Sequence, residues 1–428
     1  MLRRLLTDQG ERSTYDAVSQ CSRCGYCEQV CPTYVATGEE GLSPRGRNQA
    51  LRLLLEGKLE DRAGAERFFA TCLLCGACQT ACYTHVRVPD LVLEGRRLLR
   101  AGRAPRLARL LGWLLLAHRR WIEAALTLAY LAKRLGLSGL ASRLGFWRLA
   151  GYPGLGAADL HVREAPHRLL AEELRRRSEL RRTKDARFLY FAACGPNYVL
   201  PRVGRATVQV LSSGGKTAFL DNGCCGLLPY NYGNVATARE LARNAIRRVE
   251  DALEGAAPDA AVVADCSSCA AHLKAYPQLF VGEPQWRSRA EAFVARVKDV
   301  IELLPGLVSR DSRPLEPGTV VYHDSCRARN GQGVAREPRE ALERLCGSGC
   351  AELPDAEVCC GGAGAFSFLQ PELSDAVLRR KVAAIAGVQA KVVGVSSTSC
   401  WLQLADGLRR YYPECRVAHL SELAAERL

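Results

Sequence analysis

The sequence predicts a multidomain α+β chain with a mainly helical N-terminal domain, a helical connector and a C-terminal α/β region that contains an internal duplication. The distribution of cysteines supports this division, because residues 1–90 hold eight of them, residues 91–184 none and the rest of the chain twelve. The expected order of strands and helices occurs twice in the C-terminal region. We therefore expect domains at 1–90, 91–184, 185–312 and 313–428.

The overall composition is that of an ordinary globular protein. The 428 residues are 48% hydrophobic and 24% charged, and this length allows about two to four domains with cores of their own. The first residues, MLRRLLTDQGERST, carry positive charge but lack the apolar segment of a secretory signal. We therefore expect a cytoplasmic protein whose clustered cysteines serve metal or redox chemistry rather than disulfides.

The most apolar long segment, residues 107–131, is too interrupted to span a membrane. His118, Arg119 and Arg120 break it, and its longest charge-free part, residues 110–117, is far below the ~20 apolar residues that a span needs. We expect this segment to form a buried or amphipathic helix pair.

The net charge of +14 is concentrated in the connector. Between Arg96 and Arg187 there are 21 Lys or Arg and 7 Asp or Glu residues, which accounts for the whole excess. A basic connector could contact the inner face of an anionic membrane as a peripheral protein does, or an acidic partner subunit. A solvated basic linker is the alternative. No nucleic-acid recognition motif accompanies the charge, so we expect no nucleic-acid partner.

The internal repeat brings cysteines to the ends of strands. In the first half, expected strands at 187–193, 216–220 and 260–264 lead to Cys194, to Cys224-Cys225-Gly226 and to Cys266-Ser-Ser-Cys269. In the second half, expected strands at 319–323 and 392–395 lead to Cys326 and Cys400, and Cys359-Cys360-Gly361-Gly362 lies between them. Expected helices at 198–211, 236–253 and 371–385 follow these strands or the Cys-Cys-Gly motifs.

The two halves also agree in spacing. The first cysteine is 30 and 33 residues from the Cys-Cys pair, and that pair is 44 and 40 residues from the last cysteine. Alternating strands and helices predict parallel sheets, in which the carboxyl ends of the strands meet at one edge. Ligands bind at that edge, so we expect the cysteines of each half to share a site there.

The N-terminal domain carries two cysteine runs of the bacterial ferredoxin type. They are Cys21-x2-Cys24-x2-Cys27-x3-Cys31-Pro32 and Cys72-x2-Cys75-x2-Cys78-x3-Cys82, and this spacing predicts two [4Fe–4S] clusters. Three closely spaced thiolates can each bind one iron of a cluster, whereas the fourth cysteine points to the neighbouring cluster. We assign one cluster to Cys21, Cys24, Cys27 and Cys82, and the other to Cys72, Cys75, Cys78 and Cys31.

Two details qualify this interpretation of the N-terminal runs. Tyr83 stands where the second run would have proline, which shapes the chain's exit rather than supplying a ligand. Two zinc sites are the alternative, but zinc motifs seldom repeat four cysteines at this spacing.

The Cys-Cys-Gly motifs predict one or two further [4Fe–4S] clusters, since adjacent cysteines can bind two irons of one cluster. The expected third set is Cys194, Cys224, Cys225, Cys266 and Cys269, and the expected fourth set is Cys326, Cys359, Cys360 and Cys400. Ser397 stands where the second repeat would place its fifth cysteine, so a degenerate second half with buried thiols is the alternative.

His323, three residues before Cys326, could hydrogen-bond a cluster sulfur or carry protons, or it could be a structural histidine. The sequence contains no convincing nucleotide-binding motif. It lacks a Gly-x-Gly-x-x-Gly between a strand and a helix, and it lacks a Walker A run. We therefore expect no flavin or nicotinamide pocket in this chain and assign no catalytic residue, which points to electron transfer rather than chemistry on a substrate.

These motifs resemble the iron–sulfur subunits of bacterial glycolate oxidases, within the larger family of Cys-Cys-Gly-domain oxidoreductase subunits. The resemblance covers nearly the whole chain, and its motifs are Cys21-Ser-Arg-Cys-Gly-Tyr-Cys27, Cys31-Pro-Thr-Tyr34, Ser43-Pro-Arg-Gly-Arg47, the second cysteine run, Gly223-Cys-Cys-Gly226 and Cys359-Cys-Gly-Gly-Ala-Gly364. Related subunits occur in lactate utilisation, in anaerobic glycerol-3-phosphate dehydrogenases and in heterodisulfide reductases.

The resemblance implies that a separate FAD subunit oxidises a 2-hydroxy acid, glycolate or lactate, and that this chain relays the electrons toward quinone or another acceptor. In the heterodisulfide reductase relatives, the five-cysteine set holds a noncubane cluster, and the five cysteines of the first half match that set. Ser397 puts a noncubane cluster in the second half in doubt.

Two other functions stay open from the sequence. The complete first set would suit a thiol/disulfide reductase of the heterodisulfide type, although the incomplete second half argues against it. An iron–sulfur scaffold or redox sensor is the non-enzymatic alternative.

Overall fold

The computed structural model describes residues 14–99, 119–149, 156, 159, 162, 165–308 and 319–428. In this part of the chain, no helix has both the length and the apolar character that a membrane crossing requires. The helix pair expected at 107–131 is described only from Arg119 onward, and its earlier residues lie outside the described ranges.

The N-terminal domain is mainly helical, as predicted. Its helices are α1 (Thr14–Ser19), α2 (Tyr26–Gln29), α3 (Pro32–Thr37), α4 (Pro44–Leu55), α5 (Arg62–Ala70), α6 (Ala77–Thr80) and α7 (Val88–Leu99). The short helices α2 and α6 begin after Gly25 and Gly76, whose φ angles of 84° and 81° are left-handed and favour glycine. Each cysteine run thus turns sharply at its second cysteine, and Leu51, Phe69 and Leu91 form the core beneath.

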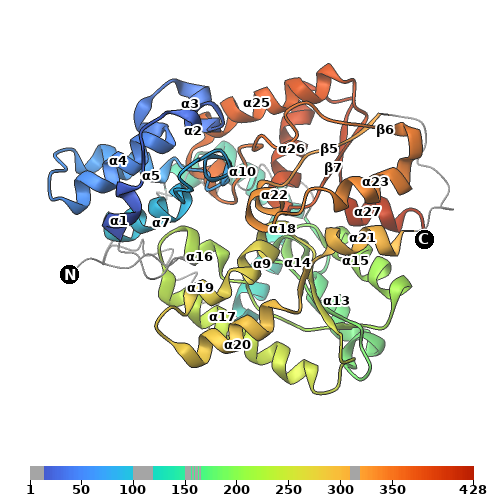
Figure 1. Ribbon diagram of the computed structural model, residues 1–428. Helices are drawn as coiled ribbons and strands as arrows, with labels where there is room; N and C mark the ends of the chain where they lie inside the picture. The colour runs from blue at the N-terminus through green and yellow to red at the C-terminus, as the bar shows by residue number, and fades with distance from the viewer. Residues whose placement is uncertain are drawn as a thin grey trace.

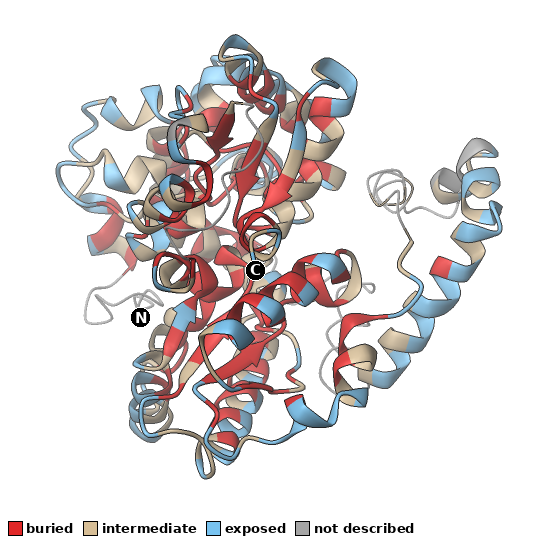
Figure 2. Ribbon diagram, turned by 90° about the vertical axis from the view of Figure 1, so that its right-hand side faces the viewer, coloured by how far each residue is buried: buried red, intermediate tan, exposed pale blue. Residues whose placement is uncertain are grey.

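The connector continues as α9 (Arg119–Arg134), α10 (Leu137–Arg143), α11 (Phe146–Leu149) and, after a gap in the description, α13 (Leu170–Arg176). Helices α9 to α11 form an arm that extends from the body of the protein and is largely exposed (Figure 2). Tyr130 is buried against the body, and its hydroxyl donates a 2.7 Å hydrogen bond to the carbonyl of Tyr198.

The C-terminal region contains two four-stranded parallel sheets of the same topology (Figure 1). The first sheet has the order β2-β1-β3-β4, with β1 (Phe188–Phe191), β2 (Thr217–Phe219), β3 (Ala261–Ala264) and β4 (Val297–Asp299). The second has the order β6-β5-β7-β8, with β5 (Val320–Tyr322), β6 (Cys350–Ala351), β7 (Val392–Val395) and β8 (Arg416–His419). The equivalent orders confirm the duplication.

Helices cover both sheets. Those of the first half are α14 (Cys194–Tyr198), α15 (Pro201–Gly214), α16 (Leu227–Asn231), α17 (Val235–Leu253), α18 (Ser267–Lys274), α19 (Tyr276–Leu279), α20 (Pro284–Val294) and α21 (Val300–Leu307). Those of the second half are α22 (Cys326–Gln332), α23 (Glu337–Cys346), α24 (Phe366–Leu369), α25 (Pro371–Gly387), α26 (Thr398–Tyr411) and α27 (Leu420–Ala425).

The two halves share one hydrophobic core. Helix α15 packs on α27 and α21 packs on α23, so that Leu211, Ile301, Leu345 and Leu423 are all fully buried in a single cluster. Burying such side chains is worth about 1.5–3 kcal/mol each. The halves are therefore held in a fixed relation, which determines how their cysteine sets face each other.

Candidate metal-binding site between the two halves

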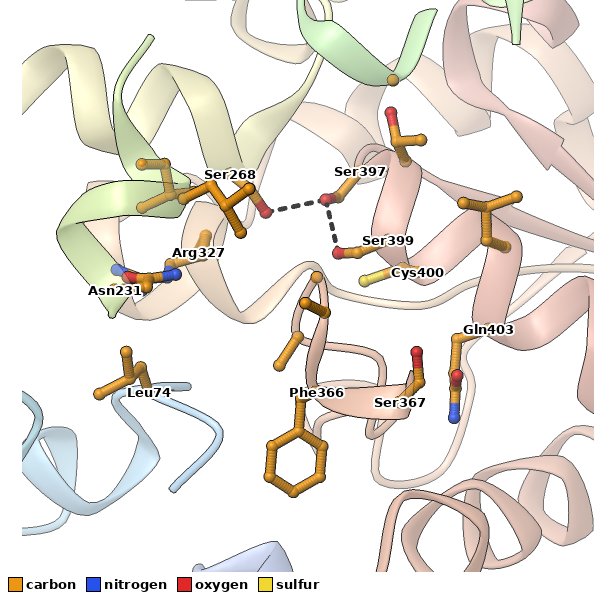
Figure 3. Close-up of a pocket in the computed structure, with 18 of the residues that line it drawn as sticks. Leu74, Asn231, Ser268, Arg327, Phe366, Ser367, Ser397, Ser399, Cys400 and Gln403 are labelled. Carbon is orange, nitrogen blue, oxygen red and sulfur yellow. Dashed lines mark hydrogen bonds between the residues drawn. The ribbon is translucent and has the colours of Figure 1, made fainter. Parts of the chain in front are cut away.

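One cavity, of about 660 Å³, contains every cysteine that the sequence assigned to the Cys-Cys-Gly sets. The cysteines that line it are Cys194, Cys224, Cys225, Cys266 and Cys269 from the first half and Cys326, Cys359, Cys360 and Cys400 from the second. Cys72 and Leu74 of the N-terminal domain line the same cavity. Figure 3 shows side chains from all three regions around it. The fold thus unites two sets that the sequence placed in separate halves.

The first set is assembled by three strand ends. Cys194 follows β1, the Cys224-Cys225 pair follows β2, and Cys266 and Cys269 follow β3. The thiol of Cys225 lies 3.3 Å from that of Cys269, and the backbone N–H of Gly226 donates a 3.4 Å hydrogen bond to the sulfur of Cys224. Three loops from one sheet edge therefore converge on one group of sulfurs, as expected for parallel strands.

The second set has the same construction. Cys326 begins α22 after β5, Cys400 lies in the first turn of α26 after β7, and the buried Cys359-Cys360 pair lies between them. Gly361 has a φ of 85°, and a Cβ atom there would lie 2.8 Å from the carbonyl oxygen of Ser374. Only glycine allows the Cys-Cys pair to approach α25 this closely.

The two sets meet across a polar contact between the halves. The hydroxyl of Ser397, which replaces the fifth cysteine of the second set, lies 3.5 Å from the sulfur of Cys266. Figure 3 shows its 2.9 Å contact with the hydroxyl of Ser268. A Cβ atom on Gly195 would lie 2.1 Å from the side chain of Thr398. Ser397 therefore faces the first set across the junction of the halves.

The electrostatics of the buried thiols favour a cation among them. A hydrogen bond with Cys269, helped by Ser397, lowers the pKa of Cys266 to about 5, whereas the bonds of Cys269 with Cys225 and Cys266 raise its own pKa well above the usual value. Neighbouring thiolates in a buried place repel one another and lose hydration. Because nine sulfurs share this cavity, they can ionise together only when cations neutralise them, and iron bound by thiolate fits this donor set.

The second N-terminal cysteine run packs directly against the second Cys-Cys-Gly set. Leu73, Cys359 and Phe366 form a buried cluster that also includes Cys75 and Cys326. The side chain of Asn330 on α22 reinforces this contact, because its amide N–H donates a 3.0 Å hydrogen bond to the carbonyl of Cys75 and its oxygen accepts one of 3.2 Å from the hydroxyl of Thr80.

The two N-terminal runs exchange their fourth cysteines in space. Burial, and then the charges of Cys75, Cys72 and Cys31, raises the pKa of Cys78 well above its usual value. Burial, and then the charge of Cys21, raises the pKa of Cys27 to about 11, and Cys82 contributes in the same direction. Cys31 thus lies near the second run and Cys82 near the first. Cys24 is exposed, so the first run is at the outer side of the domain.

Two buried arginines at these sites were not identified as functional from the sequence. Arg47 is only 2% exposed, and its guanidinium contacts the sulfur of Cys31 at 3.8 Å. Arg96 donates hydrogen bonds to the carbonyl of Cys72 at 2.8 Å and to that of Asn231 at 2.7 Å, and so joins the N-terminal domain to the first half. Arg47 belongs to the Ser43-Pro-Arg-Gly-Arg47 motif of the resemblance, although that motif assigned it no role. For Arg96, the sequence signal is a cation at a position that helical periodicity would turn toward the core.

Comparisons with known proteins agree with this architecture. Residues 17–86 match the family model of a 4Fe-4S dicluster domain, and residues 188–274 and 320–405 each match that of a cysteine-rich domain with the Cys-Cys-Gly motif. The chain is 28% identical to the probable glycolate oxidase iron-sulfur subunit of Bacillus subtilis, covering 97% of this chain and 95% of that protein. It is 26% identical to the glycolate oxidase iron-sulfur subunit of Escherichia coli, covering 91% and 90% of the two chains.

A third relative matches about half of this chain. Lactate utilization protein A of Geobacillus kaustophilus is 30% identical over 54% of this chain and 96% of its own. The N-terminal dicluster domain and the repeated cysteine-rich domain occur here in one chain, in the order that the sequence predicts. The chain therefore belongs to the family of cysteine-rich-domain iron–sulfur proteins that includes the glycolate oxidase iron-sulfur subunits and the lactate utilization proteins A.

Proposed function

We propose that this chain is the electron-transfer subunit of an FAD-linked 2-hydroxyacid dehydrogenase of the glycolate or lactate type. In this proposal a separate FAD subunit oxidises the substrate, and this chain relays the electrons to quinone or another acceptor. The names of its relatives support a hydroxyacid oxidase complex. Iron–sulfur clusters, when bound, accept and release one electron at a time.

The observation that carries the proposal is the continuity of the four cysteine sets. The outer N-terminal set includes the exposed Cys24, and the inner set, through Cys75, packs against Cys326 and Cys359. These two cysteines line the cavity that also contains the first Cys-Cys-Gly set. Four sets in contact from the surface to the cavity suit electron hopping, and we infer that the outer set and the cavity are the two ends of the relay.

The rim of the cavity supports an apolar acceptor. Leu228 and Leu369 line the cavity and are exposed, and Phe368, Tyr198 and Leu126 line it beside them. A rim of apolar and aromatic side chains suits a quinone ring. Leu126 belongs to α9, so the connector arm adjoins this opening.

The same arm supports peripheral contact with a membrane. Half of the large exposed hydrophobic side chains found in the described residues lie on α9 to α11 or in the turns between them: Trp121, Leu128, Leu131, Leu135, Leu137, Leu140, Leu144 and Phe146. Basic side chains occur in the same segment, at Arg120, Lys133 and Arg134. Apolar and basic groups together suit an anionic bilayer surface.

The test compares the purified chain, with its clusters reconstituted, in the presence and absence of the FAD subunit. We expect glycolate or lactate to bleach the cluster absorbance only when the FAD subunit is present, and quinone reduction to require both subunits. A Cys75→Ala variant should leave flavin reduction intact and abolish quinone reduction. Oxidation of the hydroxy acid by this chain alone, with an artificial acceptor, would refute the proposal.

The cavity also permits a second function, reduction of a disulfide. All five thiols of the first set line the cavity, and its volume of about 660 Å³ has room for a small disulfide beside them. This function predicts release of free thiols from a disulfide substrate when the reduced chain is supplied with a one-electron donor. If the electron-transfer proposal is right, no thiols are released under those conditions.

A further inference from the structure

His323 is a buried histidine whose ring nitrogens have no hydrogen-bond partner. It follows β5, where its backbone N–H donates a 3.0 Å hydrogen bond to the carbonyl of Gly394, and only 1% of the residue is exposed. Within the described residues, neither Nδ1 nor Nε2 has a partner. Leaving a buried polar atom unpaired costs about 1–3 kcal/mol. Coordination of one ring nitrogen by a metal would remove part of this cost.

The ring of His323 faces two sulfurs of the second set. One of its nitrogens and the thiols of Cys360 and Cys400 all lie within 4.8 Å of one another, and all three residues are buried. Cys360 and Cys400 line the cavity together with Cys326 and Cys359, whereas His323 is not part of its lining. Imidazole nitrogen and thiolate sulfur are both common ligands of iron and zinc. The geometry of this group is thus that of a mixed nitrogen and sulfur metal site.

Comparison of the two halves explains why a histidine stands here. Three residues before its first cysteine, the first half has the buried Phe191, whereas the second half has His323. The first half has Cys266 after its third strand, whereas the second half has Ser397. Ser397 lies against Cys266 of the other set. The second half has therefore lost one thiol and gained one imidazole, and each half offers five donor groups.

We propose that His323 is a metal ligand of the second Cys-Cys-Gly set, together with Cys360 and Cys400. The inference rests on the proposed function in one respect, namely that the second set holds a metal centre. A neutral imidazole in place of a thiolate makes the site less negative by one charge. Histidine ligation raises the potential of an iron–sulfur centre relative to all-cysteine ligation, so the second set would attract electrons more strongly than an all-cysteine set.

The experiment uses the full-length chain with its metal centres, isolated without oxygen. Iron and zinc are counted in the wild type and in Cys360→Ala, which shows what the second set holds. If it is iron, the protein is labelled with ¹⁵N in the rings of its seven histidines, and the reduced clusters are studied by pulsed EPR. If it is zinc, X-ray absorption at the zinc edge detects nitrogen among the sulfur ligands.

Three variants complete the test. His323→Phe introduces the residue that the first half buries at the equivalent position, and it removes both ring nitrogens. His323→Cys supplies a thiolate instead of the imidazole. His419→Asn is the matched control, because His419 is a buried histidine of the same half whose Nδ1 only accepts a 3.2 Å hydrogen bond at the start of α27. Asparagine is a good residue for such a cap.

We expect one centre of the wild type to show coupling to a histidine nitrogen, and His323→Phe to lose that coupling while His419→Asn keeps it. His323→Cys should retain the metal, lose the nitrogen signal and, for an iron cluster, lower the midpoint potential of that centre alone. Coupling that persists in His323→Phe overturns the proposal, as does its absence from the wild type. A second set without metal overturns it too.

Failure of this inference can be told apart from failure of the proposed function. If quinone reduction still depends on both subunits while no histidine nitrogen is detected, the relay stands and the ligand assignment falls. Zinc bound by His323 gives the opposite result: the ligand assignment stands, and the relay has three clusters instead of four.

Discussion

The buried Arg47 gives the sharpest prediction about the N-terminal clusters. Its guanidinium donates hydrogen bonds to the carbonyl of Phe68 at 2.7 Å and to the hydroxyls of Thr33 and Thr71 at 3.1 and 3.4 Å, and it contacts the sulfur of Cys31 at 3.8 Å. Within the described residues, no carboxylate pairs with it. A cluster bound through Cys31 would therefore carry the negative charge nearest to this guanidinium.

Replacing this residue by Arg47→Gln removes the charge and keeps a polar side chain. At an effective dielectric constant of about 20, two unit charges 3.8 Å apart interact by about 4 kcal/mol. For one electron, about 59 mV corresponds to about 1.4 kcal/mol, so the upper limit is a fall of about 170 mV in midpoint potential. Because the added electron spreads over the whole cluster, we expect a fall of about 30–100 mV.

The cost to folding should be smaller than the burial of Arg47 suggests. Without the guanidinium, the carbonyl of Phe68 still accepts a hydrogen bond from Thr71, and the hydroxyl of Thr33 still donates to the carbonyl of Leu42. Few groups are left unpaired, so we expect a loss of about 1–3 kcal/mol in the free energy of unfolding. The variant should therefore fold and bind its clusters.

The assay is a redox titration of the N-terminal clusters followed by EPR. The midpoint of the cluster that contains Cys31 should fall in Arg47→Gln and stay near the wild-type value in Arg47→Lys, which keeps the charge. Arg52→Gln is the control, because Arg52 lies on the same helix but pairs with Glu56 at the surface. Equal midpoints in wild type and Arg47→Gln, or an equal fall in Arg47→Lys, would refute the electrostatic reasoning.

Three further predictions concern the junctions and the pH response. Asn330→Ala should weaken the docking of the N-terminal domain on α22 by about 1–2 kcal/mol of interaction free energy. Freeze-quench EPR should then show slower electron transfer into the cavity. An unchanged rate would contradict the relay order. Gly195→Ala should lower the free energy of unfolding by about 1–3 kcal/mol, because its Cβ would lie 2.1 Å from the side chain of Thr398 in the other half. The control is Gly306→Ala in α21, where no atom lies within 4 Å of the added Cβ. Chemical denaturation should show that this control stabilises the protein by up to about 1 kcal/mol. Burial raises the pKa of Asp299 to about 7. Between about pH 4 and 7 the folded chain keeps a proton that the unfolded chain has released, so stability falls as the pH rises through this range. Asp299→Asn should therefore show a smaller fall in melting temperature from about pH 5 to 7.

The strands that the sequence did not predict have a common physical cause. β4, β6 and β8 are all edge strands, whereas the expected strands include both central pairs, β1 with β3 and β5 with β7. A central strand is buried on both faces and is a run of apolar residues, but an edge strand is partly exposed and needs no such run. β6, with only two residues, has neither residue buried.

The boundaries of the domains and the ligand assignments of individual cysteines stay predictions. The repeats align with the matched cysteine-rich domains, but the exact limits 312 and 313 fall in a part of the chain outside the described residues. The sequence left three roles open for His323, namely a hydrogen bond to a cluster sulfur, proton transfer and a structural role. It could not choose among them, since the choice depends on which groups the ring faces.

The sequence by itself predicted the membership of each cysteine set, because three thiols at two-residue spacings on a tight turn suit one cluster and the fourth suits its neighbour. It also determined the duplication, because equal spacing of cysteines and strands requires no knowledge of packing. Only the tertiary structure decided how the sets combine. Three contacts join residues from different domains or strands. Cys75 lies against Cys326 and Cys359. Ser397 lies against Cys266, and His323 lies near Cys360 and Cys400. Such contacts depend on how helices pack between the two sheets, and no local pattern in the chain encodes that packing.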